Sequence, residues 1–212
     1  MQKIAIIDYN MGNLHSVERA VVHAAGGHAT VAITSDPDMI RQADRVVFPG
    51  QGAARDCMRE LETRGMAEVV REVIRSKPFL GICMGMQVLM QHSEENGGIE
   101  CLGLYAGKVR YFGAVHQEID VRLKIPQMGW NQIWQQMPHP LWNGINDGAR
   151  FYFVHSYYVE PQTRDLIAGS TDYGISYASA IARDNVFAIQ AHPEKSADDG
   201  LKLLENFVNW QP

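Results

Sequence analysis

The chain has 212 residues, of which 46% are hydrophobic and 20% charged, so it carries enough apolar residues for a normal folded core. Its net charge is −5 and its basic residues are scattered, which excludes a basic stripe that would bind nucleic acid. The N-terminus reaches a charged residue too early for a signal peptide, and the longest apolar run, residues 78–90, is too short to cross a bilayer.

The first half of the chain alternates between short strand-like segments and helical segments. Strands are expected at residues 3–8, 28–34, 44–50 and 78–82, and helices over residues 17–24, from 36, over 66–74 and from 84 to about 91. β-branched residues dominate the strand segments, and apolar residues recur at helical spacing between them. This alternation predicts βαβ units and a parallel sheet.

The second half, from Gly103 to about Val186, is rich in strand-like runs and turns. Strands are expected at residues 108–112, 118–125, 149–160, 166–174 and 176–185. These runs predict antiparallel hairpins and mixed sheet, followed by a C-terminal helix that carries Leu201, Leu204 and Val208 on one face. Because there is no internal repeat, low-complexity tract or linker, residues 1–212 are expected to form a single α/β domain.

Cys83 has the form Gly-x-Cys-x-Gly and falls between an expected strand and an expected helix. A sharp turn there would strain the backbone and lift the side chain above the sheet, as in a nucleophile elbow. Gly81 and Gly85 would be required because neighbouring chains approach too closely for a Cβ. The positive end of the following helix favours the thiolate, and the N–H of Met84 could stabilise an oxyanion.

The alternative for Cys83 is an inert core thiol, since free cysteine is among the most buried residue types. The stretch alone leaves both interpretations open. Cys57 lies in a helical segment and Cys101 in a loop, and neither has glycines on both sides at a strand end. With no CxxC spacing, a disulfide framework and a cysteine zinc site are excluded, and we expect a soluble cytosolic protein with reduced thiols.

A thiolate nucleophile needs a base, and His192 is the best candidate among the eight histidines. Glu194 follows two residues later, so on an extended segment its carboxylate would lie beside the imidazole and hold its tautomer. Taken alone, such a pair more often forms a surface ion pair. Six other histidines stand among polar or loop residues and are expected at the surface: His15, His23, His28, His92, His116 and His139.

The segment Pro49–Gly52 ends a strand that we expect to neighbour the Cys83 strand. An ordinary turn is one interpretation. In the other, the backbone N–H groups of Gln51 and Gly52 face Cys83 and complete an oxyanion hole. The segment lacks the length and the lysine of a phosphate-binding loop, which argues against a nucleotide site.

Six motifs in this order resemble the class I (triad) glutamine amidotransferases. Three carry the family as a whole: Pro49–Gly52, Gly81–Gln87 and His192–Ser196. Three more are similar to the glutaminase subunits of imidazole glycerol phosphate synthases, which serve histidine biosynthesis: Asp8–Asn13, Met128–Asn131 and Tyr152–Tyr157. The resemblance covers nearly the whole chain.

The resemblance implies a flavodoxin-like domain with a mostly parallel central sheet flanked by helices, plus an antiparallel portion in the second half. It implies hydrolysis of glutamine to glutamate and ammonia without a cofactor or metal. Cys83 would attack the side-chain amide carbon, His192 would transfer protons, and Glu194 would orient His192. The glutamine-holding positions would be Gln87, Glu95 for the substrate amino group, and the backbones of Gly50–Gly52 and Ser156–Tyr157.

The resemblance also implies a heterodimer with a (β/α)8-barrel cyclase subunit that receives the ammonia. Partner-facing positions should be Asn13, Arg19, Trp130, Tyr152 and Lys195, with Trp130 exposed on a Gly-Trp-Asn loop. Two alternatives stay open: an amidotransferase subunit that feeds a surface-sugar synthase, and a catalytically silent regulatory module. The sequence departs from the family pattern at Asn10, Gln51 and Gln127.

Overall fold

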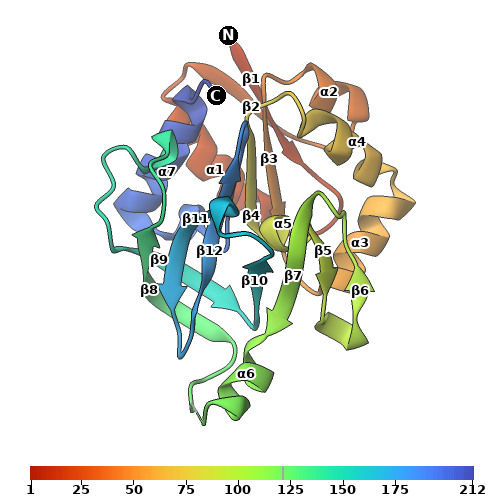
Figure 1. Cartoon of the computed structure of the whole chain (residues 1–212). Helices are drawn as coiled ribbons and strands as arrows, with labels where there is room; N and C mark the ends of the chain where they lie inside the picture. The colour runs from red at the N-terminus through yellow and green to blue at the C-terminus, as the bar shows by residue number, and fades with distance from the viewer. Residues whose placement is uncertain (121) are drawn as a thin grey trace.

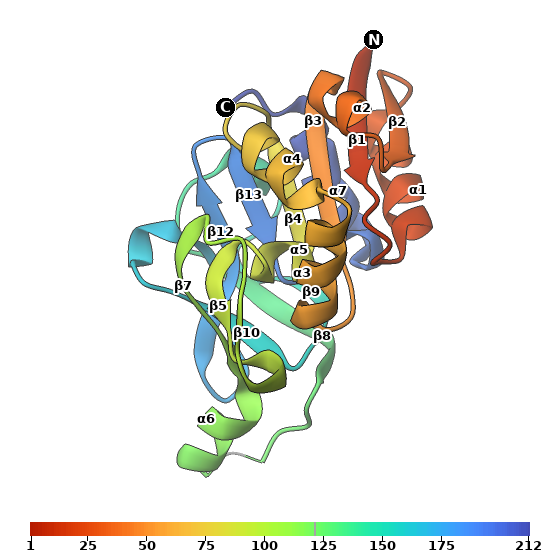
Figure 2. The ribbon, with the colours of Figure 1, turned by 90° about the vertical axis from the view of Figure 1, so that its right-hand side faces the viewer.

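The computed structural model describes residues 1–120 and 122–212. The parallel half of the sheet has the strand order β2-β1-β3-β4-β13 (Figures 1 and 2). These strands are β1 (Gln2–Ile7), β2 (Ala29–Thr34), β3 (Arg45–Gly50), β4 (Phe79–Cys83) and β13 (Val186–Ile189). The four N-terminal strands are those predicted, and β3 and β4 are neighbours, as expected. β3 and β4 are buried along their whole length, which suits the centre of a parallel sheet covered on both faces.

Helices cover both faces of the parallel strands, as Figures 1 and 2 show. α1 (Leu14–Ala25) and α7 (Ala197–Asn209) pack together on one face, and α2 (Pro37–Gln42), α3 (Ala54–Thr63) and α4 (Met66–Val73) cover the other. Each helix turns an apolar stripe to the sheet, so two buried clusters form, one on each side. This arrangement confirms the expected parallel sheet flanked by helices.

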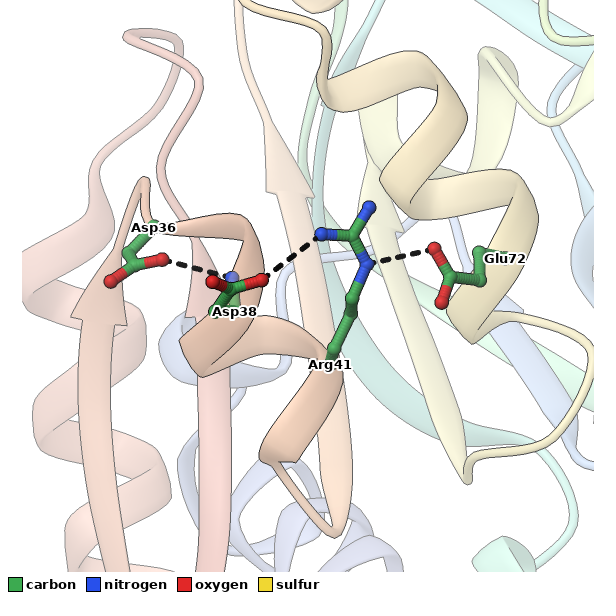
Figure 3. Close-up of polar contacts among 4 residues, drawn as sticks. All are labelled: Asp36, Asp38, Arg41 and Glu72. Atoms are coloured by element: carbon green, nitrogen blue, oxygen red, sulfur yellow. Dashed lines mark hydrogen bonds and ion pairs between the residues drawn. The ribbon is translucent and has the colours of Figure 1, made fainter.

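A short helix near the N-terminal edge shows how local sequence defines an element. The Asp36 carboxylate accepts a hydrogen bond from the Asp38 N–H at 2.9 Å and caps α2, whose first residue is proline (Figure 3). Arg41 then pairs with Asp38 and reaches Glu72 on α4 at 2.8 Å. These exposed pairs fix the approach of α2 to α4 but contribute little stability.

The second half of the chain forms most of the antiparallel part, as predicted, and two short strands before Gly103 add to it. Beyond β13 the sheet continues in the order β12-β10-β7-β5-β6, and β11, β8 and β9 branch from β12. These strands are β5 (Met90–Ser93), β6 (Ile99–Glu100), β7 (Tyr105–Tyr111), β8 (Gln127–Gln135), β9 (Ala149–His155), β10 (Tyr157–Pro161), β11 (Ile167–Asp172) and β12 (Ser176–Arg183). β5 pairs in parallel with β7, the exception to the antiparallel pattern among these strands. α6 (Phe112–Glu118) lies at the end of the molecule opposite both termini (Figures 1 and 2).

Several sequence-based expectations about elements are wrong. The helix after Cys83 is the single turn α5 (Met84–Gln87); Val88 and Leu89 form a turn after it, and Met90 begins strand β5. The strand expected over 118–125 is absent from the described residues of that segment, and Val121 lies outside them. Ser156 divides the expected strand 149–160 into β9 and β10. His116 is buried rather than exposed, with its Nε2 2.7 Å from the Tyr173 carbonyl.

Candidate active site

Cys83 is the last residue of β4 and has φ 54° and ψ −111°, a conformation that L-residues rarely adopt. Close packing explains the flanking glycines. A Cβ on Gly85 would lie 1.8 Å from the Phe48 carbonyl oxygen, and one on Gly81 would lie 2.9 Å from Ala188. The strained elbow and the need for both glycines are therefore as expected. Because α5 has only one turn, its dipole is smaller than that of the predicted helix.

Gly50 lies directly opposite Cys83 in the parallel register of β3 and β4. The loop that follows, with Gln51 and Gly52, therefore starts beside the sulfur. A Cβ on Gly50 would lie 2.2 Å from the Tyr9 hydroxyl, so glycine is required here too. The Gln51 carbonyl accepts from the Cys57 thiol at 3.3 Å, which ties this loop to α3.

His192 and Glu194 form a buried pair in which the imidazole Nδ1 lies 2.8 Å from the carboxylate Oε1. His192 has extended backbone, but Pro193–Lys195 form one 3₁₀ turn rather than the extended segment expected. Burial lowers the pKa of His192, but the neighbouring Cys83 and the Glu194 carboxylate outweigh this effect and raise the pKa to about 10. Nε2 makes no hydrogen bond to any described residue, so it is available to a substrate.

These groups meet at a cavity of about 460 Å³. Its walls come from both halves of the chain: Gln51, Gly52, Cys83, Met84, Gln87, Glu95, Pro126, Val154, His155, Ser156, Tyr157, His192 and Lys195. The structure thus brings together the candidate nucleophile, base and oxyanion loop with the expected glutamine-holding positions except Gly50, which does not line the cavity. A cavity of this size fits one small polar molecule.

Two of the residues expected to bind the substrate are themselves held in place by contacts within the protein. Glu95 accepts a hydrogen bond from the Ala54 N–H at 2.6 Å, and burial raises the pKa of its carboxyl. Gln87 is 2% exposed, and its Nε2 donates to the Tyr157 carbonyl at 3.1 Å. Its Oε1 has no partner among the described residues. A buried unpaired acceptor in a cavity wall is a suitable ligand for an N–H donor.

Sequence reasoning missed His155, which lines this cavity, and Gln190, which contacts Cys83. His155 Nδ1 lies 2.7 Å from the Tyr157 carbonyl, and its Nε2 lies 3.2 Å from the Tyr177 hydroxyl. Burial lowers the pKa of His155 to about 4, so it stays neutral at physiological pH. Gln190 is fully buried, and its Nε2 donates to Cys83 Sγ at 3.6 Å. Each is a polar residue in a strand-like run, and nothing local in the sequence marked either as part of a functional site.

Three of the expected partner-facing side chains lie together beside the site. Trp130 and Tyr152 face each other across β8 and β9 with ring centroids 6.1 Å apart, and Lys195 Nζ lies 6.0 Å from the Tyr152 ring centroid. Trp130 is 45% exposed, as expected, although it lies in a strand rather than a loop. Asn13 and Arg19 are exposed at the start of α1 and within it.

The departures from the family pattern have local explanations. Asn10 has φ 69°, a left-handed conformation that glycine adopts most easily and asparagine tolerates. Gln127 is buried and accepts from the Tyr177 hydroxyl at 2.9 Å.

Burial raises the pKa of both Cys57 and Cys101 to about 12, which keeps these thiols inert, as expected.

Two kinds of feature are absent from the described part of the chain. No group of three or more histidine, cysteine or acidic side chains could hold a metal ion there. None of its helices combines the length and the apolar character needed to cross a membrane.

Comparisons with known proteins agree with this geometry. A relative from Thiobacillus denitrificans, named imidazole glycerol phosphate synthase subunit HisH, is 58% identical over 99% of this chain and 92% of its own length. Relatives of the same name from Aromatoleum aromaticum and Pseudomonas putida are 56% and 54% identical, over 100% and 99% of this chain and 100% and 98% of their own.

Solved structures share the fold at low sequence identity. One titled as a glutamine amidotransferase has a TM-score of 0.71 at 14% identity, covering 98% of this chain and 99% of that one. The structure of PurLQS from Thermotoga maritima has a TM-score of 0.67 at 15% identity, covering 98% of both chains. The profile of the family described as glutamine amidotransferase class-I matches residues 5–210. This chain therefore belongs to the class-I glutamine amidotransferase family, among the relatives named HisH.

Proposed function

We propose that this protein is the glutaminase subunit of an imidazole glycerol phosphate synthase. It hydrolyses L-glutamine to glutamate and ammonia, and residues 1–212 act as one cytoplasmic domain. The observation that carries the proposal is the convergence of a strained Cys83 and a buried His192–Glu194 pair on one cavity. Family membership and the shared name of the relatives support it.

The first half of the reaction forms a thioester. The Cys83 thiolate attacks the side-chain amide carbon of glutamine, and the carbonyl electrons move onto oxygen. The raised pKa of His192 keeps its imidazole protonated near neutral pH, so Nε2 can give a proton to the amide nitrogen as the C–N bond breaks. Ammonia leaves and Cys83 is acylated.

The second half releases glutamate. His192, now neutral, takes a proton from water, and the resulting hydroxide adds to the thioester carbon. The intermediate collapses, the C–S bond breaks, and Cys83 leaves as thiolate beside a protonated His192. Glu194 accepts the Nδ1–H bond at 2.8 Å throughout, which keeps Nε2 directed into the cavity and stabilises the imidazolium.

Both intermediates carry an oxyanion, which needs donors near Cys83. We assign these to the backbone N–H groups of Met84, directly after the nucleophile, and of Gln51 or Gly52 in the loop opposite. Backbone donors tolerate side-chain changes, so Gln51 is compatible with this role. The loop carries a positive φ at Gly52, 90°, which an L-residue would adopt only with strain.

The remaining wall residues would hold the substrate. The Glu95 carboxylate pairs with the substrate ammonium, and Gln87 Oε1 offers an unused acceptor. The backbones of Gly50, Ser156 and Tyr157 supply further polar groups. Tyr157 lies directly after the break between β9 and β10, where backbone groups leave regular pairing.

The partner in this proposal is a (β/α)8-barrel cyclase that makes imidazole glycerol phosphate and an aminoimidazole carboxamide ribotide. Ammonia that escaped into neutral water would be protonated and lose its nucleophilicity, so direct transfer to a second subunit is chemically useful. The surface formed by Trp130, Tyr152 and Lys195, together with Asn13 at the start of α1 and Arg19 within it, is the proposed contact. Its exposed aromatic anchor beside the cavity supports this choice.

Glutamate release by the purified chain, with and without the cyclase and its nucleotide ligand, tests the function. We expect weak hydrolysis alone and a strong rise in the complex. Cys83→Ala should abolish hydrolysis while keeping the fold. Cys101→Ala removes a buried thiol that does not line the cavity, so it should keep activity. Full activity of the isolated chain would contradict coupling, and activity of Cys83→Ala would contradict the nucleophile.

A further inference from the structure

A chain of hydrogen bonds between side-chain amides leads through the buried interior to the sulfur of Cys83. Gln87 Nε2 donates to the Tyr157 carbonyl at 3.1 Å and to Gln190 Oε1 at 2.9 Å. Gln190 Nε2 then donates to Cys83 Sγ at 3.6 Å. Cys83 and Gln87 belong to one short segment, but Tyr157 and Gln190 come from distant parts of the chain, so only the folded structure joins the four.

The direction of this chain follows from its first member. A backbone carbonyl can only accept, so the Gln87 atom that faces Tyr157 must be the NH₂ group. The same nitrogen carries the second hydrogen, and it therefore requires the oxygen of Gln190 opposite it. The amide nitrogen of Gln190 is then the atom that faces Cys83. In the opposite orientation the Gln87 side-chain oxygen would face the Tyr157 carbonyl oxygen at 3.1 Å, and neither atom has a hydrogen to donate.

The surroundings keep Gln190 in this place. Its side chain is fully buried, directly after β13, and its backbone N–H donates to the Ser179 carbonyl at 2.8 Å. Gln190 also precedes His192 by two residues, so the element that presents the candidate base presents this donor as well. The Gln190 side chain has no exposed surface, so bulk solvent does not hydrate its amide.

We propose that Gln190 is a further residue of the glutaminase reaction, a neutral donor that stabilises the thiolate form of Cys83. This proposal rests on the proposed function, in which Cys83 is the nucleophile. A hydrogen bond to an anionic sulfur is stronger than one to a thiol or a thioester, because the charge is concentrated on the acceptor. The bond therefore favours the thiolate before attack and again when the thioester breaks. As an uncharged group, Gln190 adds this effect without competing with His192 for Glu194.

Alkylation of Cys83 by iodoacetamide measures thiolate formation without any turnover. Cys57 and Cys101 do not line the cavity and burial raises the pKa of both to about 12, whereas the Cys83 side chain lines the cavity, so alkylation reports on Cys83. Gln190→Met keeps the volume and removes the donor. We expect its pH profile of alkylation to move about one unit higher, so that it reacts about fivefold more slowly at the pH where the wild type is half-maximal. At high pH the two rates should converge.

Gln87→Met provides an independent arm, because it leaves Gln190 in place but removes the bond that orients its amide. Its shift should have the same direction and be smaller, and the Gln87→Met/Gln190→Met double variant should shift no further than Gln190→Met alone. Gln127→Met is the matched control. It removes a buried amide bonded to Tyr177 rather than to sulfur, and its profile should equal that of the wild type.

An unshifted profile in folded Gln190→Met would overturn the proposal, and so would an equal shift in Gln127→Met. If Gln190→Met does not fold, an unshifted Gln87→Met profile overturns it instead. Because alkylation needs no glutamine, absence of glutaminase activity would contradict the proposed function while leaving this result readable.

Discussion

The backbone N–H of His192 donates a hydrogen bond of 2.9 Å to the carbonyl of Tyr152. Ser196 reinforces this link, since its hydroxyl accepts from the Tyr152 N–H at 2.9 Å and donates to the His192 carbonyl at 2.6 Å. The candidate base and the strand that carries the proposed partner surface are thus joined through backbone. A partner seated on Tyr152 would press on the element that positions His192.

Trp130→Ala tests that surface. Trp130 is 45% exposed, so its removal should leave the fold intact while it takes away the central aromatic anchor. We expect the cyclase to bind about 30-fold more weakly, a change of about 2 kcal/mol, as measured by calorimetric titration.

Trp134→Ala is the matched control for this prediction. It lies four residues along the same strand and is 40% exposed, but its ring covers Gly148 rather than Tyr152. Its affinity for the cyclase should stay within about threefold of the wild type. Equal losses in the two variants would place the partner elsewhere.

Glu194→Gln removes one of the two neighbouring groups that raise the pKa of His192, the other being Cys83. The pKa of His192 should fall from its raised value, so the proton needed by departing ammonia is lost at lower pH. We expect glutaminase kcat/KM in the complex to fall about 100-fold near neutral pH and its alkaline limb to move to lower pH. Steady-state rates across the pH range check both effects.

The surface pair of His92 and Glu100 serves as a control for this variant. Their side chains are 3.1 Å apart, but Glu100 is 85% exposed, so Glu100→Gln should change neither rate nor profile. A Glu194→Gln profile with an unmoved alkaline limb would show that Glu194 does not set the charge of His192.

Gly85→Ala tests the packing that forms the elbow. The new methyl would lie 1.8 Å from the Phe48 carbonyl oxygen, which is backbone and cannot turn away. The free energy of unfolding in urea should fall by more than about 3 kcal/mol. Gly65→Ala is the control. Gly65 has φ 68°, and a Cβ added there would have no atom within 4 Å, so only backbone strain of about 1–2 kcal/mol is expected. Equal costs would refute the steric explanation.

Much of the fold was predictable because strand and helix signals alternate cleanly in the first half. The position of Cys83 at a strand end beside Gly50 followed from that pattern and is confirmed. The length of α5 was not predictable. Val88, Leu89 and Met90 are all buried, and a short apolar run has no period that separates helix from strand.

The candidate site was predictable only where a local motif marked it. Cys83 has its glycines, and His192 has Glu194 two residues away. Gln87 and Glu95 came from family resemblance, since nothing local distinguishes them. Gln190 and His155 were not predicted, because their contacts join residues that only tertiary structure brings together.

His155→Asn tests the buried neutral imidazole through pH. Burial lowers the pKa of His155 to about 4, so below the unfolded value of about 6.5 the unfolded chain binds a proton that the folded chain refuses. The stability from this group is complete above that value and is lost as pH falls toward 4. From pH 8 to pH 5 the loss is about 2 kcal/mol.

The variant lacks this titration. Its deficit, the amount by which its free energy of unfolding in urea falls below that of the wild type, should be largest at pH 8 and about 2 kcal/mol smaller at pH 5. His15→Asn changes an exposed histidine and should show a deficit near zero at both values. A deficit of His155→Asn that does not change with pH would mean that the folded and unfolded chains protonate this histidine alike.

The most direct test of the central claim is to locate the residue that reacts with a glutamine-derived electrophile. The complex with the cyclase would be treated with a diazoketone analogue of glutamine, digested, and mapped by mass spectrometry. A single adduct on Cys83, suppressed by excess glutamine, is the predicted result. An adduct on Cys57 or Cys101, or none at Cys83 in the presence of the partner, would contradict the account.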